Sequence, residues 1–187
     1  MRAFFCLPID AGLRAEADRV ASRLRRGTTM PASWVRPENY HITVRFLGEI
    51  EPALTASLEE AARHVSRATA PFELRVDEVG AFPSIDRARV LWVGGAANSA
   101  FERLVRSLER HLGELGFPPE REPAVAHLTI ARIKGRPDVR LPRLMEALGP
   151  LPSHSLHVDR LVLMESRLSP RGPAYDPLFS APLGGVS

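Results

Sequence analysis

Two stretches far apart in the chain repeat one arrangement of residues: "ENYHITVRFLGEI" at 38–50 and "VAHLTIAR" at 125–132. Each places a histidine two residues before a threonine within an apolar run. Side chains at positions i and i+2 of a β-strand point to the same face, so each pair shares a face if the stretch is a strand. The intervening apolar residues then pack behind the pair. The pattern therefore predicts two strands that each carry polar groups on one face.

The segments around the two motifs alternate between strand and helix patterns. Strands are expected at 2–9, 40–48, 72–82, 88–95, 125–132, 154–169 and 174–183, and helices at 11–26, 51–68, 98–116 and 141–149. Strands that follow one another through short turns favour an α+β fold with largely antiparallel sheets over a doubly wound parallel sheet. Each half of the chain repeats a helix, a His-x-Thr strand, a helix and a strand pair. We therefore expect residues 1–187 to form a single bilobal domain, with two similar lobes around a central cleft and helices on the outside.

The composition is that of an ordinary globular protein with a mildly basic charge. The formal net charge of +3 comes almost entirely from arginine, since Lys134 is the only lysine among 187 residues. Arginine favours phosphate partners because its planar guanidinium donates two parallel hydrogen bonds. Cys6 is the only cysteine, which excludes an intrachain disulfide and a thiolate metal site. The chain shows no signal-peptide pattern and no run of ~18 apolar residues, so we expect a cytoplasmic protein without a membrane segment.

Two histidines that face each other across a cleft fit general acid–base catalysis at phosphorus. His41 and His127 are the candidate catalytic residues, one taking a proton from the nucleophile and the other giving a proton to the leaving oxygen. Each such group contributes ~10²–10⁴ in rate, and imidazole titrates near neutral pH. The hydroxyls of Thr43 and Thr129 are candidate donors to the non-bridging phosphate oxygens, where charge builds up. This chemistry requires no metal and no cofactor.

A zinc site and chance recurrence are the alternatives to this interpretation. Zinc needs three or four ligands, and neither motif has a carboxylate or cysteine at ligand spacing. Chance gives two such patterns in fewer than about one shuffled sequence in a thousand. The other histidines lack a matching context, because His64 and His111 fall on solvent-facing helix positions, and His154 and His157 on opposite faces of one strand.

With these motifs and their flanks, the chain resembles the two-histidine phosphoesterase superfamily. Within that superfamily it looks most like the bacterial and archaeal RNA 2',3'-cyclic phosphodiesterases, formerly named 2'-5' RNA ligases. The similarity runs nearly end to end through "RAFFCLPID" (2–10), "WVRPENYHITVRFLGEI" (34–50), "ARVLWVGG" (88–95), "AHLTIAR" (126–132) and "LVLMESRLSPRGPAYDPL" (161–178). The order and the flanks of the two motifs make the resemblance specific, although each motif is short.

The resemblance implies two α+β lobes around a cleft that binds RNA ending in a 2',3'-cyclic phosphate, such as a tRNA fragment, and releases a 2'-phosphate. By family analogy His41 is the proton donor to the departing 3' oxygen, and His127 is the proton acceptor that activates water. Thr43 and Thr129 would bind the phosphate. We expect no metal, no cofactor and no membrane association, and we expect a monomer.

Two arginines and one departure from the family pattern also bear on the site. Arg132 matches the arginine that trails the second motif, which implies a phosphate contact, but strict alternation puts it on the face opposite His127 unless a bulge intervenes. Arg45 shares the predicted face of His41 and is a candidate RNA contact, with a solvated charge at the strand end as the alternative. Ala126 stands where the family usually has proline, and "EPAV" before the second histidine lacks an aromatic residue.

Three kinds of function are compatible with these residues. The first is hydrolysis of 2',3'-cyclic phosphate ends of RNA. The same site could join RNA ends through a 2'-5' linkage or open another cyclic nucleotide, because these reactions share one kind of transition state. A non-catalytic RNA-binding module would need arginines and aromatic residues in the cleft but not two matched histidines. An oligonucleotide with a cyclic phosphate end, incubated with and without chelator, separates the three.

Overall fold

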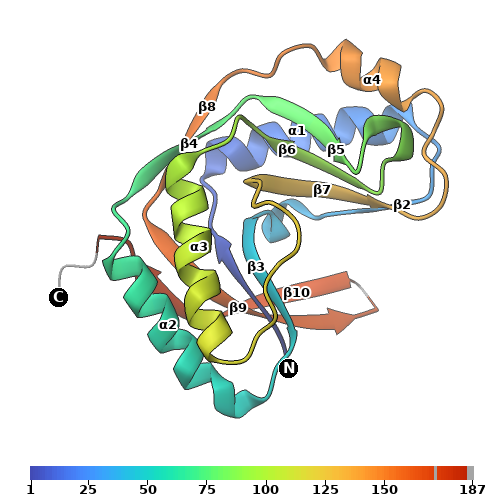
Figure 1. The fold of residues 1–187 in the computed structure, drawn as a ribbon. Coiled ribbons are helices and arrows are strands. Elements are labelled where there is room, and N and C mark those ends of the chain that lie inside the picture. The colour runs from blue at the N-terminus through green and yellow to red at the C-terminus, as the bar shows by residue number, and fades with distance from the viewer. Residues whose placement is uncertain (171, 185–187) are drawn as a thin grey trace.

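The computed structural model describes residues 1–170 and 172–184 and has an α+β architecture with antiparallel sheets (Figure 1), which confirms the expected class. Its strands are β1 (Arg2–Leu7), β2 (Ala32–Trp34), β3 (Ile42–Glu49), β4 (Phe72–Val76), β5 (Glu78–Phe82), β6 (Val90–Gly94), β7 (His127–Ile133), β8 (His154–Val158), β9 (Arg160–Ser169) and β10 (Gly172–Pro182). Its helices are α1 (Ala11–Gly27), α2 (Thr55–Arg67), α3 (Ser99–Glu114) and α4 (Leu141–Leu148). Short 3-10 turns occupy Pro37–Asn39, Pro52–Leu54 and Ile85–Arg87.

The main sheet is divided into two halves at its centre. In the described chain its 8 strands run in the order β10-β9-β1-β3-β7-β6-β5, with β2 beside β7. The ladder between β3 and β7, both fully described, consists of the pair Ile42 and Leu128. On either side of this joint the strands separate into β10-β9-β1-β3 and β7-β6-β5, which form the two lobes visible in Figure 1.

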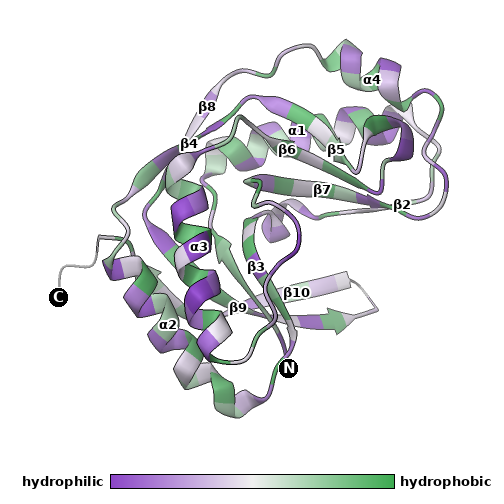
Figure 2. Ribbon diagram, viewed as in Figure 1, coloured by the Kyte–Doolittle hydropathy of each residue, from purple (hydrophilic) through white to green (hydrophobic). Residues whose placement is uncertain are grey.

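One helix packs against each half-sheet, and a second helix packs on the first. α2 and α3 pack together and α2 contacts β9 and β10, whereas α1 packs against α4 and β7. Side-chain caps start two helices: Asp10 Oδ1 accepts from the Leu13 N–H at 2.7 Å, and Asn98 Oδ1 accepts from the Phe101 N–H at 3.0 Å. Hydrophilic and hydrophobic residues alternate along α2 and α3, as a helix with one buried face requires (Figure 2). No helix in residues 1–170 and 172–184 is long and apolar enough to cross a membrane.

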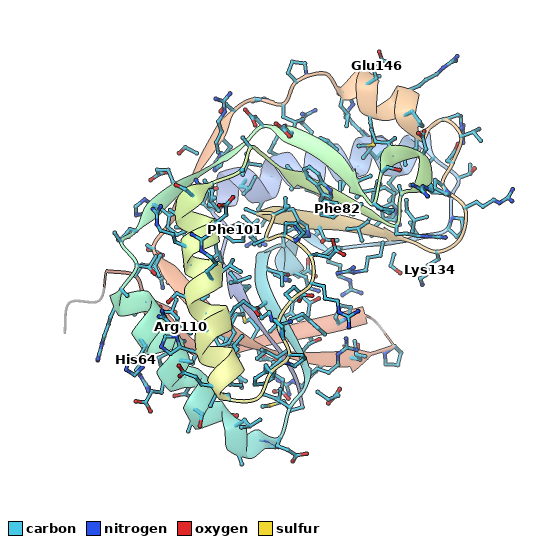
Figure 3. All side chains as sticks on the ribbon, in the orientation of Figure 1. His64, Phe82, Phe101, Arg110, Lys134 and Glu146 are labelled. Atoms are coloured by element: carbon cyan, nitrogen blue, oxygen red, sulfur yellow. The ribbon has the colours of Figure 1, made fainter. Side chains whose placement is uncertain are left out.

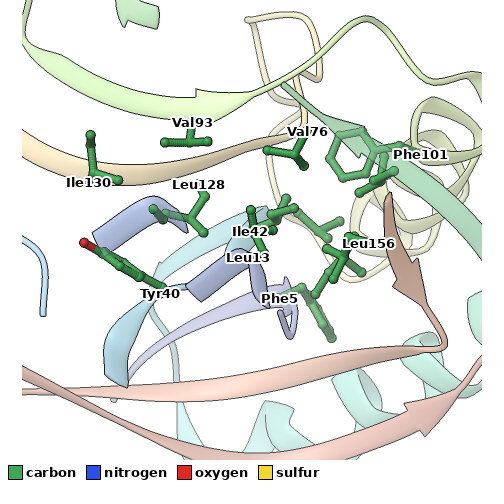
Figure 4. Packing of buried hydrophobic residues seen from close by; sticks show 14 of the residues in the cluster. Phe5, Leu13, Tyr40, Ile42, Val76, Val93, Phe101, Leu128, Ile130 and Leu156 are labelled. Carbon is green, nitrogen blue, oxygen red and sulfur yellow. The ribbon is translucent and has the colours of Figure 1, made fainter. Parts of the chain in front are cut away.

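One hydrophobic cluster extends through both halves of the molecule. Ile42 and Leu128 belong to it, are almost fully buried, and lie among Leu13, Phe5 and Val93 in Figure 4. Burying an aliphatic side chain of this size contributes ~1.5–3 kcal/mol. Because the backbone ladder at the joint is so short, packing of these side chains holds the two half-sheets together.

Two of the expected strands are wrong as single elements. The stretch expected at 72–82 breaks at Asp77 into β4 and β5, and the stretch expected at 154–169 breaks at Asp159 into β8 and β9. In both cases the chain leaves a two-stranded sheet of β4 and β8 and enters the main sheet. Aspartate is disfavoured within strands, and both backbones bond elsewhere: the Asp77 N–H donates to the Gly94 carbonyl at 2.9 Å, and the Asp159 carbonyl accepts from the Leu183 N–H at 2.8 Å.

Truncating the joint should destabilise the fold. Leu128→Ala should lower the free energy of unfolding by about 2–5 kcal/mol, because it leaves a cavity between the half-sheets. Urea unfolding followed by circular dichroism measures this loss. Leu168→Ala is the matched control, since Leu168 is 67% exposed and its truncation should change the free energy by less than about 0.5 kcal/mol. Equal losses in the two variants would show that the joint is not a packing centre.

Candidate active site

The two His-x-Thr motifs meet at the joint between the half-sheets. β3 begins one residue after His41, and β7 begins at His127. Because Ile42 pairs with Leu128 in antiparallel fashion, one step to either side brings the histidine of each motif toward the threonine of the other. The paired apolar side chains enter the core, so the polar side chains of both motifs face the opposite way. The joint therefore creates an arrangement with local two-fold symmetry.

Matching bulges follow the two motifs. The register between β1 and β3 shifts at Val44, and the register between β6 and β7 shifts at Ile130, so each motif strand contains one extra residue there. The extra residue resets the alternation of side chains beyond it. Arg132 consequently lies on the face of Thr129, and both residues line one cavity. Arg132 could reach the cleft only if a bulge reset the alternation after Thr129, and this bulge is present.

Phe46 occupies the position in β3 that Arg132 occupies in β7. It is 43% exposed and lines the same cavity as Arg132. The guanidinium carbon of Arg2 lies 5.2 Å from the centre of the Phe46 ring, and the Phe4 ring lies 6.5 Å from it. Sequence reasoning missed these three residues. Alignment of "HITVRF" with "HLTIAR" places Phe46 at the arginine position and would have identified it.

The His41 imidazole is fixed in orientation by the backbone and by two rings. Its Nδ1 lies 2.8 Å from the Asn39 carbonyl oxygen, and its Nε2 lies 3.1 Å from Thr43 Oγ1. A carbonyl only accepts hydrogen bonds, so Nδ1 carries the proton in the neutral ring and Nε2 is free to accept from the hydroxyl. Phe4 stacks on the ring at 4.8 Å, and Tyr175 meets it edge-on at 5.2 Å.

His127 repeats this arrangement in the other lobe. Its Nδ1 lies 2.8 Å from the Val125 carbonyl oxygen, which again places the proton on Nδ1. Phe82, which lies next to β7 in Figure 3, meets the ring edge-on at 5.0 Å, and Trp92 lies 6.4 Å away. Each histidine is thus held by a carbonyl two residues earlier and by two aromatic rings. Both Nε2 atoms remain available for proton transfer.

The pKa values of both catalytic candidates are lowered. Burial is the main cause for His41 and for His127, and the nearby Arg132 cation lowers both pKa values further. The hydrogen bonds from Nδ1 to the backbone act in the opposite direction, because they favour the charged ring. Burial and the Arg132 cation thus favour the neutral form of both imidazoles in the free protein. An anion bound between them would raise both pKa values.

Most of the expected site residues line one cavity of about 450 Å³, termed the His41 cavity. The expected residues in its wall are His41, Thr43, Thr129 and Arg132, and other residues in its wall include Arg2, Phe4, Asn39, Phe46 and Tyr175. The charged side chains among these are arginines, and the rest are aromatic rings and small polar groups. Such a lining suits an anionic group attached to a planar ring.

A second cavity, of about 690 Å³, lies on the His127 side and is termed the His127 cavity. It shares Thr43 with the His41 cavity, so the two adjoin at the motifs. Its charged lining consists of Arg45, Arg106, Glu102, Glu109, Glu120 and Glu122. Carboxylates outnumber guanidinium groups in this lining, whereas the charged groups that line the His41 cavity are the guanidinium groups of Arg2 and Arg132. The two sides of the candidate site therefore differ in charge.

Arg45 points away from the face that alternation predicted for it. Its side chain is 9% exposed and forms ion pairs with Glu109 and Glu120. The bulge at Val44 accounts for the difference, because it shifts the alternation before Arg45. Contact between Arg45 and RNA stays a prediction.

The remaining histidines lie outside both cavities. His64 and His111 stack on each other at 5.7 Å between α2 and α3, and His64 lies well away from β7 in Figure 3. His154 pairs with Asp10 of the α1 cap at 2.9 Å. Among residues 1–170 and 172–184, no three or more His, Cys, Asp or Glu side chains are grouped so as to hold a metal ion.

Nearly the whole chain matches one known protein family. The family described as "LigT like Phosphoesterase" matches residues 7–92 and 95–175. The chain belongs to the LigT-like phosphoesterase family. This membership confirms the resemblance to two-histidine phosphoesterases that the motifs indicated.

Several LigT-like phosphoesterases are similar to this chain over almost their full length. The protein of Methanothermobacter thermautotrophicus is 34% identical over 176 residues, which cover 94% of this chain and 95% of the relative. The protein of Thermotoga maritima is 31% identical over 186 residues, which cover 99% and 97%. Both relatives bear the name RNA 2',3'-cyclic phosphodiesterase.

Solved structures share the fold of this LigT-like phosphoesterase. A crystal structure of a Thermus thermophilus protein matches with a TM-score of 0.84 at 28% identity and covers 99% of each chain. Escherichia coli LigT in complex with 3'-AMP matches with a TM-score of 0.78 at 21% identity over 98% of each chain. The similarity to E. coli LigT, at 21% identity, shows a common fold.

Removing the Arg132 cation should raise the pKa values of both site histidines. Arg132→Met deletes a positive charge that disfavours the protonated rings of His41 and His127. Nitrogen-15 NMR titration of the histidine side chains measures both pKa values in the ligand-free protein. Arg103→Met, an exposed position on α3, is the matched control and should leave both values unchanged. Unchanged values in Arg132→Met would place the guanidinium outside the site.

Proposed function

We propose that this protein hydrolyses the 2',3'-cyclic phosphate end of RNA to a 2'-phosphate, without a metal ion. One observation carries the proposal: the joint of the half-sheets brings two histidines together with both Nδ1 protons fixed by backbone carbonyls. An acid and a base that act through their Nε2 atoms are what an in-line displacement at phosphorus requires. The names of the full-length relatives support the same reaction.

The charge difference between the two cavities supports the assignment of acid and base. Arginines and aromatic rings line the His41 cavity, which therefore suits the terminal nucleotide and its phosphate. The departing 3' oxygen belongs to that nucleotide, so His41 is the proton donor. Attack comes from the opposite side, where the carboxylate-rich His127 cavity admits neutral water. His127 is accordingly the proton acceptor.

Thr43, Thr129 and Arg132 would stabilise the phosphate as charge builds on its non-bridging oxygens. In the free protein the Thr43 hydroxyl lies 3.1 Å from His41 Nε2. When substrate binds, that hydroxyl can turn to the phosphate and leave Nε2 to the leaving oxygen. The Arg132 guanidinium supplies a fixed positive charge in the same cavity. Together these groups act as donors arranged in advance of the reaction.

The charge of the His127 cavity also weighs against 2'-5' ligation as the main reaction. Ligation would use a 5'-hydroxyl of a second RNA strand in place of water, and that strand carries phosphates. Glu102 and Glu122 lie in the wall that the strand would have to approach. Like charges brought together at an interface disfavour binding. Hydrolysis is therefore the proposed reaction, with short RNA such as tRNA fragments as substrate and a monomeric, cytoplasmic enzyme.

Single histidine substitutions should abolish turnover. His41→Ala and His127→Ala should each lower kcat by ~10²–10⁴ or more on an oligonucleotide with a 2',3'-cyclic phosphate end, and the double variant should be little worse. Gel separation of cyclic and opened products measures the rates. His64→Ala on the outer surface is the control and should keep the wild-type rate.

Excess EDTA should have no effect on the rate of hydrolysis, because the proposed mechanism uses no metal ion. Loss of activity that zinc restores would replace this mechanism with metal catalysis.

The pH dependence of kcat/KM should be bell-shaped, with its maximum on the acidic side of 6.5, the usual pKa of histidine. Activity falls as pH rises through the lowered pKa of His41, which must be charged, and falls as pH drops through that of His127, which must be neutral. The profile of kcat should lie at higher pH, because bound phosphate raises both pKa values. Stopped assays in constant-ionic-strength buffers measure both profiles. A maximum of kcat/KM above pH 8 would contradict the assignment.

A further inference from the structure

Arg45 is the only charged residue that is buried as a whole among the described residues. From β3 it reaches α3 and the loop that follows α3. Its Nε forms an ion pair with Glu109 at 2.5 Å, and its Nη1 forms one with Glu120 at 2.7 Å. Nη1 also donates to the Phe46 carbonyl at 3.0 Å, and Nη2 donates to the Pro118 carbonyl at 2.5 Å. A single guanidinium thus connects three segments of the chain.

The loop held by this guanidinium leads directly to the second catalytic candidate. Residues 117–126 form no helix or strand, and in Figure 1 they run from the end of α3 past β3 to β7. The Glu120 N–H donates to Glu109 Oε2 at 3.2 Å, which strengthens the attachment at one end of the loop. At the other end, the Val125 carbonyl holds Nδ1 of His127 at 2.8 Å. Displacement of the loop would move that carbonyl.

The chemistry of this contact requires arginine in particular. A planar guanidinium donates in several fixed directions at once and here reaches one carboxylate and two carbonyls, whereas a lysine is a single point of charge. A buried charge is tolerated only when partners compensate its lost hydration, and Glu109 and Glu120 provide this compensation. These two carboxylates also oppose the approach of an RNA phosphate to the guanidinium.

We propose that Arg45 is a positioning residue that acts on His127 through the loop. By clamping Pro118 and Glu120 to the strand that follows His41, it keeps the Val125 carbonyl in place, so that the two imidazoles stay aligned. Its catalytic consequence rests on the proposed function. The structural part of the proposal, that Arg45 controls which nitrogen of His127 is protonated, is independent of the proposed function.

The test compares three variants with the wild type. Arg45→Met removes the charge and all donors, and Arg45→Lys keeps the charge without the planar group. Glu120→Gln removes the ion pair with the loop but leaves the Pro118 contact. Glu120 has a 51% exposed side chain, so Glu120→Gln should fold even if Arg45→Met does not. Arg103→Met is the matched control, because it removes an exposed arginine from α3.

Nitrogen-15 NMR of the ligand-free protein reports which ring nitrogen carries the proton. In the wild type, neutral His127 should be protonated at Nδ1. In Arg45→Met that preference should be lost, and in Arg45→Lys and Glu120→Gln it should be weakened. His41 should stay unchanged in every variant, because Asn39 holds it independently. A His127 tautomer that is unchanged in both Arg45→Met and Glu120→Gln overturns the proposal.

Kinetics on the cyclic-phosphate oligonucleotide add a second readout. Arg45→Met should lower kcat at least about tenfold and by no more than the ~10²–10⁴ that one acid–base group contributes, with KM little changed. The acidic limb of its pH profile should move to lower pH, since loss of the Val125 hydrogen bond lowers the pKa of His127 further. A higher KM with unchanged kcat would identify Arg45 as an RNA contact and overturn the proposal. If the wild type lacks this activity, the proposed function fails. The NMR result by itself then decides whether Arg45 positions His127.

Discussion

The pairing of Ile42 with Leu128 is the contact on which the rest of the arrangement depends. It is the ladder pair between β3 and β7, and its two side chains are buried in the shared core. A slip of one residue in either strand would turn a histidine and a threonine into the core and an apolar residue into the cleft. Desolvating those polar groups without partners would be costly. Apolar packing therefore sets the register of both motifs at the same time.

Much of the fold and the centre of the site follow from local sequence patterns. The helices, the α+β class and the shared face of the histidine and threonine in each motif could be predicted because each depends on the spacing of neighbouring residues. The face of Arg132 and the surroundings of Arg45 could not, because each depends on a bulge that exists only once β1 or β6 is paired beside the motif strand. The carboxylate partners of Arg45 are also far along the chain.

Other differences arose from signals that were present in the sequence. Asp77 and Asp159 interrupt long apolar stretches and mark the points at which the chain changes sheets. Phe46 occupies the position that Arg132 has in the second motif, so the two lobes are similar in backbone but not in side chains. This difference between equivalent positions provides an aromatic ring from β3 and a cation from β7. The approximate symmetry of the fold thereby supports a site with distinct sides.

The hydrogen bonds from Nδ1 of His41 and His127 have a consequence for sequence variation. In a Ser-His-Asp triad, a carboxylate side chain selects the tautomer, and a single substitution removes it. Here the acceptors are the main-chain carbonyls of Asn39 and Val125, which every amino acid possesses. The side chains at these two positions can therefore diversify without changing which ring nitrogen is protonated. Only an alteration of the backbone itself, such as an ester in place of the amide that follows Val125, would weaken that acceptor directly.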